Sequence, residues 1–339
     1  MRWLRGLLWL LATGLVLAGA AGFVVWQDYR QFVDRPLRSL SEPIEFELPK
    51  GASLRRSLGV LRSAGIREGH DLYWRFLAHE LGVQSRLKAG EYRLAAELTP
   101  GAVLQQLADG KVIQRKFTVI EGWNFRELRA ALAQLDAVQH TLGAASEAEI
   151  MQELGRAGVA AEGRFLPETY HYTRNTTDIA LLRRAMQSMD QALAEAWETR
   201  QPGLPLRNPD EALILASIIE KETGQHGERA EIAGVFVRRL QIGMRLQTDP
   251  TVIYGLGANF DGNLTRAHLQ TDTAWNTYTR DGLPPTPIAM PGRAALRAAV
   301  QPAAGKALYF VARGDGSHAF SNTLSEHNRA VQQYQLRRR

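Results

Sequence analysis

The sequence predicts an α+β protein with one transmembrane helix, a small β-α-α-β module and a larger mixed domain. A single apolar run lies near the N-terminus, at residues 7–26. Short alternating segments flank helical patterns in residues 44–117, whereas residues 118–339 show mostly helical periodicity with few strand-like stretches. Apolar residues recur every three to four positions in helices and every two in strands, so these patterns separate the three parts.

Residues 7–26 carry no charged side chain and reach the roughly 20 apolar residues that an α-helix needs to cross a bilayer. Two arginines precede the run and only one follows closely, which predicts that residues 1–6 are cytoplasmic and the remainder is outside. A cleaved signal peptide is the alternative, because the run contains an Ala/Gly-rich site. We expect an uncleaved anchor, since the run exceeds the usual h-region of about 7–15 residues. Residues 27–43 then form a polar linker.

Residues 44–117 predict a compact module. Its expected elements are a strand that leads to a Lys-Gly turn, two helices, a second strand and an N-capped helix ended by Gly110. They lie in FELPKGASL, from Leu54 to Leu61, from Leu72 to Leu81, in AGEYRL and from Thr99 to Asp109.

The central helix of the larger domain is expected from Asn208 to Gly224. Asn208 is a good N-cap, Pro209 suits the first helical position, and Glu211 stands where a capping-box carboxylate reaches back. Gly224 is the expected C-terminal stop. Residues 212–219 are almost entirely apolar, which predicts a helix buried on all sides.

Two glutamates, Glu220 and Glu222, end this helix, and each shares a helical stripe with apolar residues. Desolvation by such neighbours raises the pKa of a carboxyl and lets it hold a proton near neutral pH, as a general acid must. The alternative is that both pair with Lys221 or with an arginine at the helix end. Spacing alone does not decide between these interpretations.

The remaining elements are expected to be helices joined by loops and closed by a hairpin. EGRFLPETYHY, residues 162–172, predicts a loop and strand that expose or half-bury several rings. Helices are expected at 128–135, 146–154, 179–197 and 228–240. A hairpin is expected to turn at Gly314-Asp315-Gly316, before a last helix through His327 and Tyr334.

Composition argues against several functions. The absence of cysteine excludes disulfides, thiolate nucleophiles and cysteine-ligated zinc. The net charge of +6 is spread through the chain without a basic, aromatic-interleaved element, so we expect no nucleic-acid partner. His226, His318 and His327 match no metal-ligand spacing, and we predict neither metal nor cofactor.

Four ordered motifs carry a family resemblance. They are LASIIEKET, LQTDPTVIYGLG, GLPPTPI and FVARGDGSHAFS. Together they closely resemble the YceG-like family of membrane-bound endolytic murein transglycosylases, over nearly the whole chain. The resemblance implies that residues 44–117 are a LysM-like module and residues 118–339 the catalytic domain.

The resemblance also implies a reaction, which is cleavage of the β-1,4 bond between N-acetylmuramic acid and N-acetylglucosamine inside peptidoglycan strands. It places the catalytic glutamate on Glu220. A single carboxyl suffices, because after protonating the glycosidic oxygen it can accept the proton of the muramyl C6 hydroxyl, which attacks C1 of its own sugar to give a 1,6-anhydro end.

Substrate-binding roles are hypotheses for Gln247, Asp249, Asn276, Tyr278 and Glu168. These side chains would hydrogen-bond acetamido groups or orient Glu220. For Asp249 the alternative is a turn residue before Pro250, and for Asn276 a cap or loop residue.

Two other functions stay open. A hydrolase of the lysozyme type would need a second carboxylate, for which Asp249 is the best candidate. A membrane-tethered wall-binding protein without activity is the other. The expected location is the inner membrane, crossed once through residues 7–26, with the catalytic domain in the periplasm. The family suggests work beside peptidoglycan synthases, terminating nascent strands.

Overall fold

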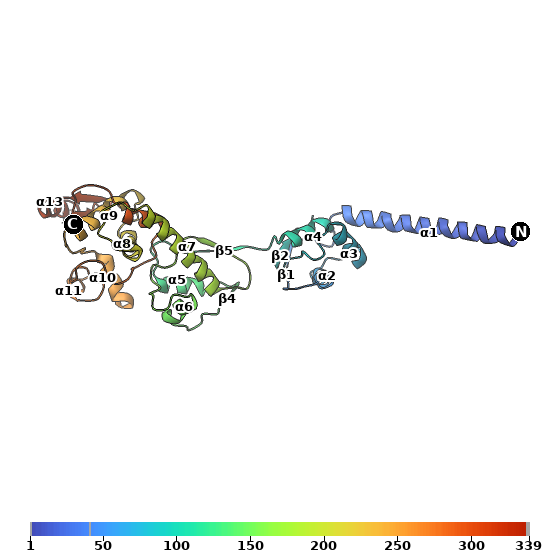
Figure 1. Cartoon of the computed structure of the whole chain (residues 1–339), viewed down its shortest axis with the longest axis horizontal. Helices are drawn as coiled ribbons and strands as arrows, with labels where there is room; N and C mark the ends of the chain where they lie inside the picture. The colour runs from blue at the N-terminus through green and yellow to red at the C-terminus, as the bar shows by residue number, and fades with distance from the viewer. Residues whose placement is uncertain (1, 41, 337–339) are drawn as a thin grey trace. The chain divides into compact units, whose positions relative to one another are not determined.

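The computed structural model describes residues 2–40 and 42–336, and it divides the chain into two compact units. The division falls between Arg115 and Lys116, two residues before the expected boundary at 117/118. Phe117 is buried in the core of the second unit, which explains why the boundary precedes it. The two units are described separately (Figure 1).

Helix α1 (Arg2–Asp34) begins the first unit and is continuous. Its segment Gly6–Asp34 is long and apolar enough to cross a membrane, with a mean hydropathy of 2.2 and no part of its apolar window buried in the protein. The helix extends eight residues beyond Trp26 into the expected linker 27–43. There Tyr29 enters the core of the following module.

The module has the expected strand–helix–helix–strand order. Strands β1 (Ile44–Leu48) and β2 (Gly90–Leu94) pair antiparallel, with α2 (Leu54–Ser63) and α3 (Asp71–Glu80) between them in sequence. Helix α4 (Pro100–Asp109) follows, capped by Thr99 and ended by Gly110 in the left-handed conformation, as predicted. Large rings such as Trp74 and Tyr92 fill the core that these elements share.

The second unit is mainly helical and has two apolar cores. The 21-residue helix α7 (Asp178–Glu198) contributes its first half to one core and its second half to the other. The first core also contains α5 (Phe125–Leu132), α6 (Glu147–Glu153) and β5 (Thr169–Tyr172). Within the described part of the chain its strands pair in twos: β3 (Arg115–Thr118) with β5, β4 (Val138–Gln139) parallel to β6 (Thr176–Thr177), and β7 (Tyr309–Ala312) antiparallel to β8 (His318–Ser321).

Helix α8 (Pro209–Glu222) is the centre of the other core, as the sequence predicts, and residues 212–219 are buried. It packs against α7, α9 (Arg229–Gln241) and α12 (Arg293–Val300). Two expectations about its ends are wrong. The helix stops at Glu222 because Thr223 is extended, so Gly224 is not the stop. Glu211 accepts hydrogen bonds from the backbone N and guanidinium Nε of Arg207, because the residue before the cap supplies both donors.

The remaining helices surround these cores. They are α10 (Asp249–Leu256), α11 (Arg266–Gln270), α13 (Leu324–Val331), the short 3-10 turns His226–Glu228 and Gly257–Asn259, and the π-helical turn Gln332–Leu336. The expected hairpin is confirmed by β7 and β8. The expected loop and strand in 162–172 are confirmed by β5, but the expectation that its rings are exposed or half-buried is wrong, since Phe165, Tyr170 and Tyr172 are buried in the core with α5 and α6.

Candidate active site

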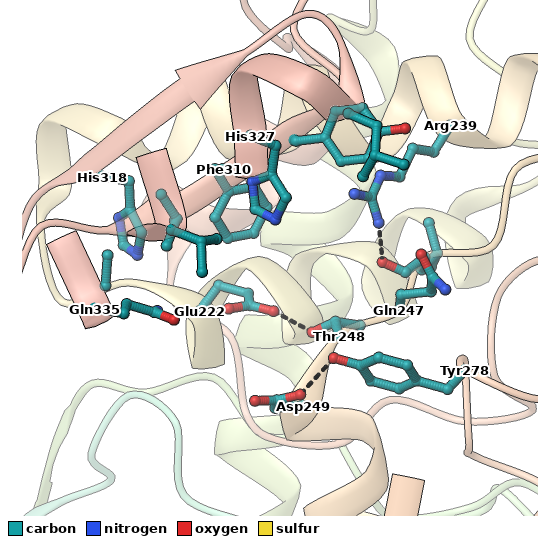
Figure 2. A pocket seen from close by; sticks show the side chains of 16 residues that line it. Glu222, Arg239, Gln247, Thr248, Asp249, Tyr278, Phe310, His318, His327 and Gln335 are labelled. Carbon is teal, nitrogen blue, oxygen red and sulfur yellow. Dashed lines mark hydrogen bonds between the residues drawn. The ribbon is translucent and has the colours of Figure 1, made fainter. Parts of the chain in front are cut away.

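A cavity of about 410 Å³ opens where the end of α8 meets the hairpin β7–β8 and the segment that leads to α10 (Figure 2). Its polar lining includes three residues of the expected substrate site, Gln247, Asp249 and Tyr278. The other polar or charged lining residues are Glu222, Arg239, Thr248, Tyr309, His318, His327 and Gln335. Tyr309, Phe310 and Leu246 give one side of the cavity an apolar character.

Glu222 is the carboxyl that α8 presents to this cavity. It is the last residue of the helix, and it accepts a hydrogen bond from the hydroxyl of Thr248 (Figure 2). Burial raises the pKa of Glu222 to about 7; the Thr248 hydroxyl and the positive charge of Arg239 limit the rise, while Asp249 adds to it. A carboxyl with this pKa holds a proton at neutral pH and releases it easily, which suits acid and base chemistry in one group.

The segment that holds Thr248 is rigid. The backbone N–H of Thr248 donates to Thr277 Oγ1 at 3.1 Å, and Thr251 Oγ1 lies 2.9 Å from the same atom. The preceding residue, Gln247, has a φ of 47°, in the left-handed region that non-glycine residues rarely adopt. Strain of this kind persists only where the surrounding structure enforces it, and it is concentrated at functional sites.

Asp249 and Tyr278 form a second polar pair at the cavity. The hydroxyl of Tyr278 donates to Asp249 Oδ1 at 2.6 Å (Figure 2). Burial raises the pKa of Tyr278, and the hydrogen bond to Asp249 raises it further, so this phenol stays protonated as a donor. Asp249 is the first residue of α10, where the helix dipole favours a negative charge.

Two basic side chains face the cavity from the other side. Arg239 is buried and donates from Nε to Leu308 O at 2.7 Å and from Nη1 to Leu246 O at 2.6 Å. His318 Nδ1 lies 2.7 Å from Glu228 Oε2, and its backbone N–H donates to Glu228 Oε1 at 3.0 Å. These contacts hold both basic side chains in place. From there their positive charge favours the ionised form of Glu222.

Glu220 lies outside the cavity lining. Its carboxylate accepts from Arg229 Nη2 at 2.8 Å and from the backbone N–H of Gly292 at 2.8 Å, and the side chains of Glu220 and Arg229 are each only 4% exposed. Glu220 is thus desolvated on its stripe with Leu213 and Ala216, as expected, and it also has the arginine partner that the alternative interpretation predicts. Glu222 has Thr248 as its partner instead.

Two other predicted site residues are not brought to the cavity. Asn276 is fully buried; its amide donates to the carbonyls of His268, Leu269 and Thr271, and its Oδ1 accepts from Tyr278 N at 2.8 Å. It therefore fixes the loop that positions Tyr278, as the loop alternative predicts. Glu168 pairs with Arg293 at 3.2 Å, and both side chains are more than 40% exposed.

Two further cavities lie along α10, of about 380 and 450 Å³. The first is lined by Lys221 and Pro250, the chain neighbours of Glu222 and Asp249. Both cavities are lined by Asn124, Arg126, Tyr254 and Gly257. The larger one adds Trp275, whose ring lies 5.5 Å from that of Tyr254, so it presents an aromatic surface of the kind on which sugars pack.

Thr248, Arg239 and His318 are site residues that sequence reasoning did not assign. Thr248 was visible inside the QTDP cluster, but nothing in the sequence marked Arg239 or His318 as neighbours of Glu222. His327 stacks on Tyr309 with centroids 5.2 Å apart, and the side chain of His226 lies outside the described part of the chain. Within residues 2–40 and 42–336, no three His, Cys, Asp or Glu side chains form a group that could hold a metal.

Comparison with known proteins places this geometry in context. A sequence profile of the YceG-like family matches residues 46–333. The endolytic murein transglycosylase of Bacillus subtilis is 27% identical over 322 residues, with 88% of each chain covered. That of Streptococcus pneumoniae D39 is 26% identical over 85% of this chain, which spans 57% of the pneumococcal protein. A crystal structure of a YceG-like protein from Listeria monocytogenes is 27% identical and superposes with a TM-score of 0.54, covering 86% of this chain and 99% of that one.

Proposed function

The chain belongs to the YceG-like family, and on that premise we propose that it is an endolytic murein transglycosylase. It would cut the bond between N-acetylmuramic acid and N-acetylglucosamine inside peptidoglycan strands. Relatives that carry this name match across most of the chain, and the cavity at the end of α8 contains a carboxyl suited to the chemistry.

The observation that carries the proposal is the position of Glu222 at the cavity, and on it we propose Glu222 for the role of catalytic acid that the family resemblance assigns to Glu220. Burial raises the pKa of Glu222 to about 7, and its carboxyl lines a cavity. Glu220 is committed to Arg229 and Gly292 N. Removing Glu220 from that contact would leave Glu121, at 3.5 Å, as the carboxylate next to the buried Arg229 guanidinium, and breaking a buried ion pair costs about 3–5 kcal/mol.

The proposed reaction needs one carboxyl. Protonated Glu222 gives its proton to the glycosidic oxygen as the bond from that oxygen to C1 of the muramyl sugar breaks. The Glu222 carboxylate then accepts the proton of the C6 hydroxyl while the C6 oxygen forms a bond to C1. This step restores protonated Glu222 and leaves a 1,6-anhydro end without consuming water. Proximity of the hydroxyl to C1 within one sugar favours this ring closure.

The surrounding residues have separate roles in the proposal. Thr248 orients Glu222 and stabilises its carboxylate through a hydrogen bond, and Arg239 and His318 favour the same ionised state. The Tyr278–Asp249 pair and Gln247 would bind polar groups of the sugars. The two cavities along α10 would hold sugars beyond the cavity at Glu222, as the binding of a long strand requires.

We further propose that α1 anchors the chain in the inner membrane with the N-terminus in the cytoplasm. Two arginines before the apolar run support this orientation. In this arrangement the enzyme would act on nascent strands next to peptidoglycan synthases and end their elongation. The LysM-like character of the module also belongs to the proposal, on the basis of its β-α-α-β order.

The test is mass spectrometry on the products that full-length protein in detergent forms from uncrosslinked glycan strands. Wild type and Glu220→Gln should yield 1,6-anhydromuramic ends, and Glu222→Gln should yield none. Loss of products in folded Glu220→Gln, with Glu222→Gln active, would reverse the assignment. Reducing ends heavier by one water would instead indicate a hydrolase and direct attention to Asp249. Glycan binding without cleavage by wild type would favour the binding protein.

A further inference from the structure

Helix α3 carries an exposed apolar surface that the catalytic proposal does not use. Between Trp26 and the end of the first unit, the exposed large apolar side chains among the described residues are Leu72, Phe76 and Leu81, at 61%, 53% and 40% exposure. Two of them lie on α3 and the third is its C-cap. Leu72 and Phe76 are four residues apart and share one face of α3, and Leu81 lies at the C-terminal end of the helix, so the exposed apolar surface consists of this face and this end.

This surface lies next to the membrane helix. The ring of Phe76 is 5.2 Å from that of Tyr29, and Trp74 packs on Phe32 with ring centroids 5.3 Å apart. Tyr29 is about one helical turn nearer the apolar run than Phe32, so the ring of Phe76 lies nearer to that run than the ring of Trp74. Figure 1 shows α3 on the side of the module from which α1 extends.

The depth of Phe76 follows from the geometry of α1. Tyr29 is three residues beyond Trp26, the last residue of the apolar run, which corresponds to a rise of about 4.5 Å along a helix. The interfacial layer into which amphipathic helices insert their apolar face is about 5–10 Å deep. Phe76 is thus placed at the height of this layer when α1 spans the bilayer.

The contact between α1 and α3 is fixed by polar as well as aromatic groups. Tyr73 donates its hydroxyl hydrogen to Asp28 Oδ2 at 3.0 Å, and the Tyr29 hydroxyl donates to Glu80 Oε2. These bonds tie both ends of α3 to the same stretch of α1. Arg75 and His79, also exposed on α3, add the polar side chains that interfacial helices present to lipid headgroups.

We infer that α3 lies in the headgroup layer of the membrane that α1 spans. Phe76 and Leu81 contact lipid, and Leu72 lies about one helical turn farther from the bilayer centre. The inference rests on the proposed anchoring by α1. The ligand of this surface is a phospholipid bilayer, because Phe76 lies beside Tyr29, three residues beyond the exposed apolar surface of α1 that ends at Trp26.

The absence of native cysteine allows a direct test by single-cysteine labelling of the full-length chain. Val16→Cys, Phe76→Cys, Leu81→Cys and Glu97→Cys would each be labelled with an environment-sensitive fluorophore and reconstituted into phosphatidylcholine–phosphatidylglycerol vesicles. Nitroxide-labelled lipid would serve as the quencher. Glu97 is the matched exposed control, since the adjacent Leu98 accepts a hydrogen bond from Leu37 N, beyond the end of α1.

The expected result is strong quenching at positions 16, 76 and 81 and little at 97. Quenching at 16 with positions 76 and 81 as weakly quenched as 97 would overturn the inference and leave the anchor intact. A blue-shifted but unquenched label at 76 would also overturn it, because the surface would then face a second copy of the chain. No quenching at 16 would overturn the anchor itself, and the inference with it.

Discussion

Glu220 and Glu222 lie two positions apart at the end of α8, yet a buried guanidinium contacts the first carboxyl and a cavity opens at the second. The helix turns about 200° between them, so one side chain faces Arg229 and the other faces Thr248. This difference in partners separates a structural carboxylate from a candidate acid within the same LASIIEKET motif.

The first prediction concerns the stability of Glu222→Gln. Burial raises the folded-state pKa of Glu222 to about 7 from its ordinary value of 4.5, so wild type loses stability as pH rises through that window. Glutamine does not ionise. The free energy of unfolding of the variant should therefore equal that of wild type near pH 4.5 and exceed it at pH 8 by up to about 3 kcal/mol. Thermal unfolding in detergent at both pH values would measure this, and an equal difference at both would contradict it.

Glu220→Gln should behave in the opposite way. It leaves Arg229 buried without its main carboxylate, and we expect a loss of about 3 kcal/mol in unfolding free energy at neutral pH. Activity per folded molecule should be retained. Chemical denaturation alongside the activity assay measures both, with Glu220→Gln/Arg229→Gln as the control that removes the stranded charge and should recover part of the loss.

The pH dependence of cleavage provides a third prediction. The acid must be protonated, so the rate should fall as pH rises through about 7. Asp249→Asn removes a negative charge that raises the pKa of Glu222, so the fall in rate should occur at lower pH in this variant. Thr248→Val removes the hydrogen bond that lowers the pKa and should move the fall in rate to higher pH. Shifts in the same direction for both variants would argue against Glu222 as the titrating group.

Gln247 offers a matched pair of variants. Both Gln247→Gly and Gln247→Ala remove the side-chain amide from the cavity and should lose activity equally. Only alanine retains the cost of the left-handed conformation at φ 47°, so the glycine variant should be more stable than the alanine variant by about 1–2 kcal/mol. Unfolding curves of the two proteins measure the difference, and equal stabilities would show that the backbone relaxes.

Asn276 is expected to act through the position of Tyr278. Asn276→Asp keeps the acceptor for Tyr278 N but cannot donate to the carbonyls of His268, Leu269 and Thr271. Leaving buried acceptors without donors costs about 1–3 kcal/mol. We expect lower stability and a reduced kcat, and a rise in KM alone would indicate direct contact with substrate.

Local signals in the sequence predicted much of the fold. Asn208 and Pro209 mark the start of α8, Thr99 and Gly110 bound α4, and the Gly-Asp-Gly turn joins β7 to β8, because capping and turn preferences act over a few residues. The apolar run of residues 7–26 is confirmed as part of the long helix α1. The buried rings of 162–172 were misjudged because aromatic composition does not reveal which face meets a core.

The choice between the two glutamates could not come from the sequence. Helical spacing places side chains on faces, but the partners of Glu220 lie 9 and 72 residues further along the chain, and Thr248 lies 26 residues beyond Glu222. Such contacts depend on how α8, α9 and α12 pack. The same holds for Asn276, whose burial becomes visible only when the loop around it is folded.

Helix α1 is continuous from the proposed membrane anchor into the module, so its length determines where the module lies relative to the anchor. Each residue between Trp26 and Tyr29 sets the height of the module by about 1.5 Å and its bearing by about 100°. A single insertion there would raise the module by only about 1.5 Å while turning it by about 100° about the helix axis, whereas an insertion of seven residues would raise α3 by about 10 Å, which is the full depth of the headgroup layer, with nearly its original bearing. The number of residues in α1 therefore sets two properties of the module that contacts it: its distance from the bilayer and its orientation about the helix axis.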